Sequence, residues 1–164
     1  EAFLLEVLSD FQVSVPEIGT IVAKVKPLVF LTSNNTREMS DALKRRCLHL
    51  HIPFPEAKVE RTILERRVPG LSQTLNRELV AFVQAVRAID LKKQPSVSET
   101  IDWAKTLLLL NAEHLSLDLV RDTLNVFLKF EQDIASATEQ LPALLAQARK
   151  DAELPLSSHH ASHA

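Results

Sequence analysis

Hydrophobic and polar residues alternate with two different periods along this chain. Apolar positions recur every three or four residues over residues 1–9, which predicts a helix. Every second residue is then apolar over residues 11–15 and again over residues 21–25, and a turn signal with proline and glycine lies between them at residues 16–19. The pattern predicts a β-hairpin over residues 12–25.

Two further apolar stretches predict strands of a larger sheet. A continuous apolar run over residues 28–32 has the character of a buried strand, and it leads into the polar amide of Asn34. Ser40 is a suitable N-cap for a short helix over residues 41–46. The alternation over residues 47–52 then predicts the next strand of the same sheet.

From residue 56 onward the apolar period is helical, beyond a break at residues 53–55 that contains two prolines. Ser72, Ser96 and Ser116 are predicted N-caps, and Ser96 with Glu99 has the spacing of a capping box. The main helices are expected over residues 73–89, 97–110 and 117–130, and a shorter pair flanks Pro142. We place an α/β part at residues 1–54, a helical domain at 55–153 and a disordered tail at 154–164.

Composition and charge narrow the classes of protein that fit. The chain has 164 residues, is 46% hydrophobic and carries a formal net charge of −2, which indicates a soluble globular protein with no basic bias toward nucleic acid. No uncharged apolar run reaches the length of about 18 residues that a membrane span needs, so cytoplasmic is the default location. Gly19 and Gly70 are the only glycines, which excludes a glycine-rich phosphate loop within this sequence.

The order of these motifs resembles part of the AAA+ ATPases, most closely the MoxR branch. The resemblance rests on FLLEVLSDFQVSVP at residues 3–16, Thr-Ser-Asn at residues 32–34 and Ala-Leu-Lys-Arg-Arg at residues 42–46, and it covers about residues 1–115. It implies an α/β remnant of an AAA+ core with a β-hairpin insertion, followed by an all-α lid. The protein is expected to be predominantly α-helical overall.

By this resemblance Asn34 is the sensor 1 residue, which positions the water that attacks the γ-phosphate. Arg46 is the arginine finger, and Arg45 is the alternate finger if the register shifts by one residue. Phosphoryl transfer needs such groups because negative charge spreads over the phosphate oxygens in the transition state. Asn34 is also a good turn residue, and arginines also suit a helix C-terminus, so both structural interpretations stay open.

The resemblance departs from the family in the lid. Glu99 occupies the place of the usual sensor 2 arginine, and a carboxylate there repels phosphate. Either another cation has taken the role, or this branch senses nucleotide differently, or Glu99 is only the N3 residue of a capping box. The cations considered are Arg87, Lys92, Lys93 and Lys105.

The resemblance also implies that the chain is the C-terminal fragment of a longer ATPase, because it lacks the Walker A and Walker B motifs. The intact parent would use ATP and Mg²⁺ to remodel a partner protein or mature its metal centre, as a homo-oligomeric ring, commonly a hexamer. A von Willebrand A-domain protein is a candidate partner. This chain alone is expected to bind no cofactor and to lack substantial ATPase activity. The alternative is a non-catalytic, AAA+-derived module that binds proteins, either clamp-loader-like or an adaptor.

No metal site is expected. His49 and His51 would share one face of a strand, but no third ligand lies near them in the sequence. The single cysteine, Cys47, cannot form an intramolecular disulfide.

Overall fold

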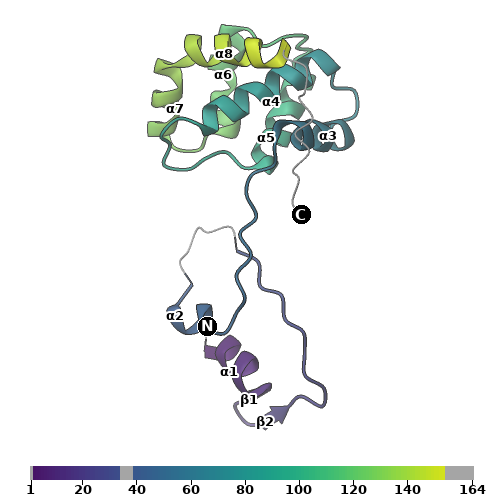
Figure 1. Cartoon of the computed structure of the whole chain (residues 1–164), viewed down its shortest axis with the longest axis vertical. Coiled ribbons are helices and arrows are strands. Elements are labelled where there is room, and N and C mark those ends of the chain that lie inside the picture. Colours follow the sequence, from purple (N-terminus) through teal and green to yellow (C-terminus); the bar gives the residue numbers. More distant parts are fainter. Residues whose placement is uncertain (1, 34–38, 154–164) are drawn as a thin grey trace, which may run out of the picture. The chain divides into compact units, whose positions relative to one another are not determined.

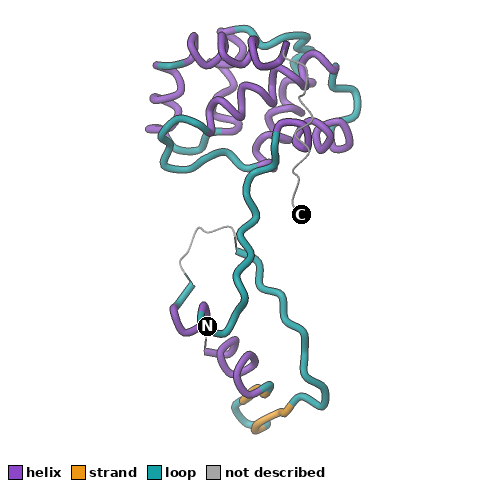
Figure 2. Tube along the Cα trace, viewed as in Figure 1, coloured by secondary structure: helices purple, strands orange, loops and turns teal. Residues whose placement is uncertain are grey.

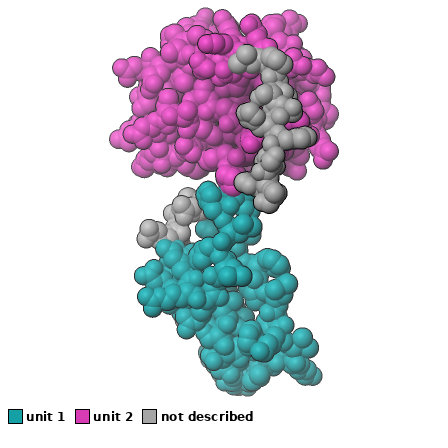
Figure 3. Space-filling model, in the orientation of Figure 1, with its two compact units in different colours: residues 1–52 teal, residues 53–164 magenta. Residues whose placement is uncertain are grey.

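The computed structural model describes residues 2–33 and 39–153, and it divides the chain into two compact units, Glu1–Ile52 and Pro53–Ala164 (Figure 3). The division falls beside the segment with two prolines where the sequence places a domain boundary. Most of the regular structure in the described residues is helical, as Figure 2 shows, so the expectation of a predominantly α-helical protein is confirmed. No described helix is both long and apolar enough to cross a membrane.

The first unit begins with a helix and a hairpin. Helix α1 (Ala2–Asp10) ends where Phe11 takes a left-handed backbone conformation with φ of 52°. Strands β1 (Gln12–Val15) and β2 (Gly19–Val22) then pair antiparallel, which confirms the hairpin although its second strand is shorter than predicted.

A side-chain contact joins the hairpin to α1. Both the backbone N–H and the hydroxyl of Ser14 donate to the Glu6 carboxylate, at 3.1 and 2.6 Å. These hydrogen bonds lower the pKa of Glu6 below its ordinary value of 4.5, because they favour the ionised carboxylate. The hairpin is therefore attached to the helix by a charged group.

The short helix α2 (Asp41–Lys44) has Ser40 at its N-cap position, as predicted. The Ser40 carbonyl accepts from the N–H groups of Leu43 and Lys44, both at 3.0 Å. The helix is shorter than the expected 41–46, because Arg45 is its C-cap and Arg46 follows in a turn.

The predictions of strands over residues 28–32 and 47–52 are wrong, and with them the larger sheet of the predicted α/β part. The only sheet in the described residues is the two-stranded hairpin, and both segments are irregular (Figure 2). Their apolar side chains face solvent: Phe30 is 81% exposed and Leu48 is fully exposed. Apolar β-branched composition favours a strand, but the hydrogen bonds of a strand come from a neighbour, and the two described strands are paired with each other.

The second unit is a bundle of six described helices (Figure 1). They are α3 (Ala57–Arg67), α4 (Gln73–Arg87), α5 (Val97–Leu109), α6 (Leu117–Phe127), α7 (Glu131–Glu139) and α8 (Leu141–Glu153). The three serine N-caps are confirmed, since each side chain accepts a hydrogen bond from the backbone N–H three residues later. Pro142 lies inside the first turn of α8, where its missing N–H costs nothing.

An aromatic cluster forms the centre of this bundle. Trp103 from α5 stacks on Phe127 from α6, with ring centroids 4.4 Å apart, and Phe82 from α4 packs against both rings. The indole N–H of Trp103 donates to the Thr123 hydroxyl at 2.8 Å, so the one polar atom of the buried indole is satisfied. Helix α4 also packs against α3 and α8, which makes it the central element of the unit.

Candidate functional site

Two adjacent arginines lie at the C-terminal end of α2, in the first unit. The Arg46 guanidinium folds back on the protein: its Nε donates to the Ser9 hydroxyl at 2.5 Å, and its Nη1 donates to the Ala42 carbonyl at 2.8 Å. Arg45 is exposed, and its side chain has no partner among the residues that the structure describes. Arg46 is therefore held in place by hydrogen bonds, whereas Arg45 makes no such contact within the described part of the chain.

Asn34, the predicted sensor 1 residue, lies outside the described residues. The structure brings Arg45 and Arg46 together, and it does not place either of them relative to Asn34. The predicted strand that should deliver Asn34 is absent from residues 28–33, as described above.

Glu99 is the N3 residue of a complete capping box at the start of α5. The Ser96 backbone N–H donates to its carboxylate at 2.7 Å, and the Glu99 N–H donates to the Ser96 hydroxyl at 3.4 Å. Burial raises the pKa of Glu99. The Ser96 N–H and the Lys93 ammonium, 2.9 Å away, have a larger effect in the opposite direction, so the pKa lies below its ordinary value of 4.5. The capping box predicted from Ser96 and Glu99 is therefore confirmed, and both of its reciprocal hydrogen bonds are formed.

The four cations proposed to replace a sensor 2 arginine have different surroundings. Lys93 pairs with Glu99, and the Lys92 ammonium lies over the Phe130 ring, 4.5 Å from its centroid. Lys105 is exposed, with its ammonium 3.6 Å from the Asp102 carboxylate on the same helix. The ammonium groups of Lys92 and Lys105 could therefore still donate hydrogen bonds to a phosphate.

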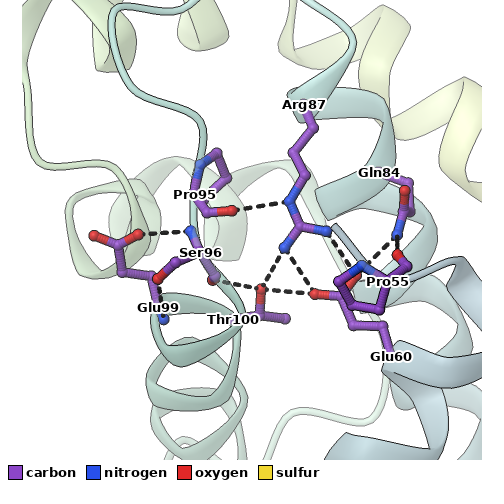
Figure 4. Close-up of polar contacts among 8 residues, drawn as sticks. All are labelled: Pro55, Glu60, Gln84, Arg87, Pro95, Ser96, Glu99 and Thr100. Carbon is purple, nitrogen blue, oxygen red and sulfur yellow. Dashed lines mark hydrogen bonds and ion pairs between the residues drawn. The ribbon is translucent and has the colours of Figure 1, made fainter. Parts of the chain in front are cut away.

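Arg87, in contrast, is part of a buried polar network that the sequence did not reveal (Figure 4). Its Nη1 and Nη2 donate to the two carboxylate oxygens of Glu60 at 2.7 and 2.8 Å, while its Nε donates to the Pro95 carbonyl at 2.8 Å. The Thr100 hydroxyl accepts from Nη2 at 3.2 Å and donates to Glu60 at 3.1 Å. Since the side chains of Glu60 and Arg87 are 0% and 5% exposed, this guanidinium cannot meet a phosphate.

A fifth member of the network, Gln84, comes from the same helix as Arg87. Its amide nitrogen donates to Glu60 at 2.9 Å and to the Pro55 carbonyl at 3.0 Å, as Figure 4 shows. The only signal in the sequence is that Gln84 and Arg87 lie three residues apart in a stretch of α4 that is otherwise apolar from Leu79 onward. That signal does not identify a partner 27 residues away.

Other candidate chemistry is sparse in the described residues. No three His, Cys, Asp or Glu side chains gather there in a way that could hold a metal ion. His49 has a ring nitrogen 3.1 Å from the Lys44 carbonyl, and Cys47 is a free, half-buried thiol. A hollow of about 240 Å³ lies between α1 and the hairpin and is lined mainly by apolar side chains, including Val7, Phe11 and Val13.

Comparison of the chain with protein-family models, with curated proteins and with solved structures finds no match. The family assignment therefore remains a prediction that rests on the motifs and on the arginines at the end of α2.

Proposed function

We propose that this chain is the C-terminal part of a MoxR-like AAA+ ATPase. The first unit is then the end of the α/β core, with the hairpin as its insertion, and the helical unit is the lid. The parent couples the binding and hydrolysis of ATP, with Mg²⁺, to remodelling or metal-centre maturation of a partner protein. It acts in the cytoplasm as a homo-oligomeric ring.

The observation that carries this proposal is the pair of guanidinium groups at the end of α2. A finger that acts on a neighbouring subunit has to lie at the surface, and Arg45 and Arg46 are both exposed. A guanidinium can bridge two phosphate oxygens, and it stays charged at any physiological pH. The Ser9 and Ala42 contacts of Arg46 use Nε and Nη1, which leaves Nη2 for a phosphate oxygen.

A second observation supports an incomplete core. Leu28, Phe30 and Leu50 are 84%, 81% and 86% exposed, although the burial of each such side chain is worth about 1.5–3 kcal/mol. Stretches of this kind normally pack against a partner. In the proposed parent, further strands of the core cover them.

ATP turnover by the parent protein tests the proposal. We expect Arg46→Ala to lower kcat by about 10³-fold or more while nucleotide binding is retained, because an arginine finger stabilises only the transition state. Asn34→Ala should also lower turnover strongly, because it removes the side chain that would position the attacking water. Lys44→Ala is the matched control, since it removes a neighbouring cation from α2, and it should leave turnover within about twofold.

Mixing experiments separate action in trans from action within one subunit. Arg46→Ala subunits should regain turnover when they are mixed with Asn34→Ala subunits, because each supplies what its neighbour lacks. Normal turnover by a double variant that carries both Arg45→Ala and Arg46→Ala would refute the assignment. Robust turnover by the isolated 164-residue chain would also refute it.

The alternative is a non-catalytic, AAA+-derived module that binds other proteins. The observation in its favour is that Arg46 already serves a structural role, since it joins α2 to Ser9 of α1. A parent that binds its partner but neither binds nor hydrolyses ATP would support this second function.

A further inference from the structure

The buried Glu60–Arg87 pair has contacts that reach the segment through which the chain enters the helical unit. Pro55 comes directly before Glu56, the N-cap of α3, and its carbonyl accepts from Gln84 at 3.0 Å. Phe54 lies over the Arg87 guanidinium, with the ring centroid 4.5 Å from the guanidinium carbon. Phe54 and Pro55, the last two residues of the connection formed by residues 52–55, are therefore held by side chains of α4.

Each contact depends on the ion pair beneath it. The Gln84 amide nitrogen has two hydrogens, and it donates one toward Glu60 and the other toward Pro55, so the carboxylate sets the direction of the amide. The Arg87 plane that Phe54 covers is fixed by the bidentate bonds to Glu60 and by the bond to the Pro95 carbonyl. Because these three hydrogen bonds fix the Arg87 guanidinium, it cannot rotate away from the Phe54 ring.

The ion pair is a poor device for stability alone. Well-packed apolar residues of similar volume often stabilise a protein as well as a buried ion pair does, whereas bidentate hydrogen bonds define one geometry. What this geometry defines, beyond the packing of α3, α4 and α5, is the position of Phe54 and Pro55.

Local backbone restrictions add to this effect. Pro53 and Pro55 have fixed φ angles, and a residue that precedes a proline is restricted to extended conformations. Ile52 and Phe54 both precede a proline. These restrictions leave φ of Ile52 and ψ of Pro53 free, so the chain can still bend there, whereas Phe54 and Pro55 are also attached to α4.

We infer that the Glu60–Arg87 pair, acting through Gln84 and Phe54, clamps residues 54 and 55 to the helical unit. The pair thereby fixes the direction from which the chain enters this unit. Bending of the connection is confined to the residues before Phe54, so residues 54–56 move together with the helical unit. This conformational device does not depend on the activity proposed above.

Backbone amide relaxation of the full 164-residue chain tests the clamp. Phe54 and Glu56 have amides, whereas the prolines between and before them have none. We expect the Phe54 amide to have an order parameter of about 0.85, as in a rigid helix, and the Ile52 amide to fall below about 0.6. The double variant Phe54→Ala with Gln84→Leu should bring the amide of residue 54 below about 0.6 as well.

Val59→Ala is the matched control, because Val59 is a half-exposed apolar residue next to Glu60 and takes no part in the network. It should leave the Phe54 amide unchanged. Phe54→Ala alone serves if the double variant perturbs the bundle, since Phe54 is 43% exposed and its loss opens no cavity in the core. A Phe54 amide that is as mobile as Ile52 in the native chain, or one that stays rigid in both variants, would overturn the inference.

Discussion

Replacement of Arg87 by methionine is the most demanding test of the buried network. The substitution keeps most of the side-chain volume but leaves the Glu60 carboxylate, which is 0% exposed, with hydrogen bonds from Gln84 and Thr100 only. Loss of one partner of a buried pair typically costs about 3–5 kcal/mol, because an uncompensated charge remains inside. The Pro95 carbonyl also loses its donor, which adds to the penalty.

The double variant Glu60→Leu with Arg87→Met separates the charge from the packing. Because it removes both charges, its free energy of unfolding should lie within about 2 kcal/mol of the native value. Together with the single variant Glu60→Leu, these values complete a double-mutant cycle, whose coupling energy should be at least about 2 kcal/mol. Arg121→Met is the control, since its pair with Asp118 is 51% and 83% exposed, and it should change stability by less than about 0.5 kcal/mol.

Urea unfolding followed by tryptophan fluorescence is the assay, because the chain has one tryptophan and no tyrosine. Trp103 is fully buried in the helical unit, so its emission reports on that unit alone. With an m-value of about 1.5 kcal/mol per M, Arg87→Met should lower the midpoint by about 2–3 M. A loss of less than about 1 kcal/mol would show that water or a relaxed backbone solvates Glu60, and the argument from desolvation would then be wrong.

Two further predictions concern the first unit. Because Ser14 lowers the pKa of Glu6, the contact between hairpin and helix is fully formed above pH 4.5 and should be lost as the pH falls through the lower pKa of the folded state. The chemical shift of the Ser14 amide should report this loss, and Glu6→Gln should remove the titration. Phe30→Ser with Leu50→Ser should reduce self-association of the chain in sedimentation velocity, since both side chains are more than 80% exposed. Leu109→Ser, at a residue that is 82% exposed in the helical unit, is the control, and an equal effect from it would count against a special role of the first unit.

The helical unit was largely predictable because its signals are local. Ser96 and Glu99 lie three residues apart and cap the same helix, so the residues that decide the helix start are all within one turn. The hairpin was predictable for the same reason, since Gly19 provides the left-handed conformation that its turn requires.

The rest depended on partners that are distant in the sequence. The apolar run at residues 28–32 has the composition of a strand, yet no described neighbour supplies its hydrogen bonds. Nothing in the sequence distinguishes Glu60 from other acidic residues in the first turn of a helix, where a carboxylate is favourable anyway. Only the packing of α3 against α4 shows that it meets Arg87, so the sequence alone could not separate this structural arginine from a phosphate sensor.

The bare apolar segments of the first unit also have a consequence for the life of the protein in a cell. Chaperones and proteases recognise extended hydrophobic chain, and they act continuously on whatever exposes it. Leu28, Phe30 and Leu48 would be such a signal whenever they are uncovered. The amount of this chain in a cell should therefore follow the supply of the surface that covers them, so that unassembled copies are removed by quality control.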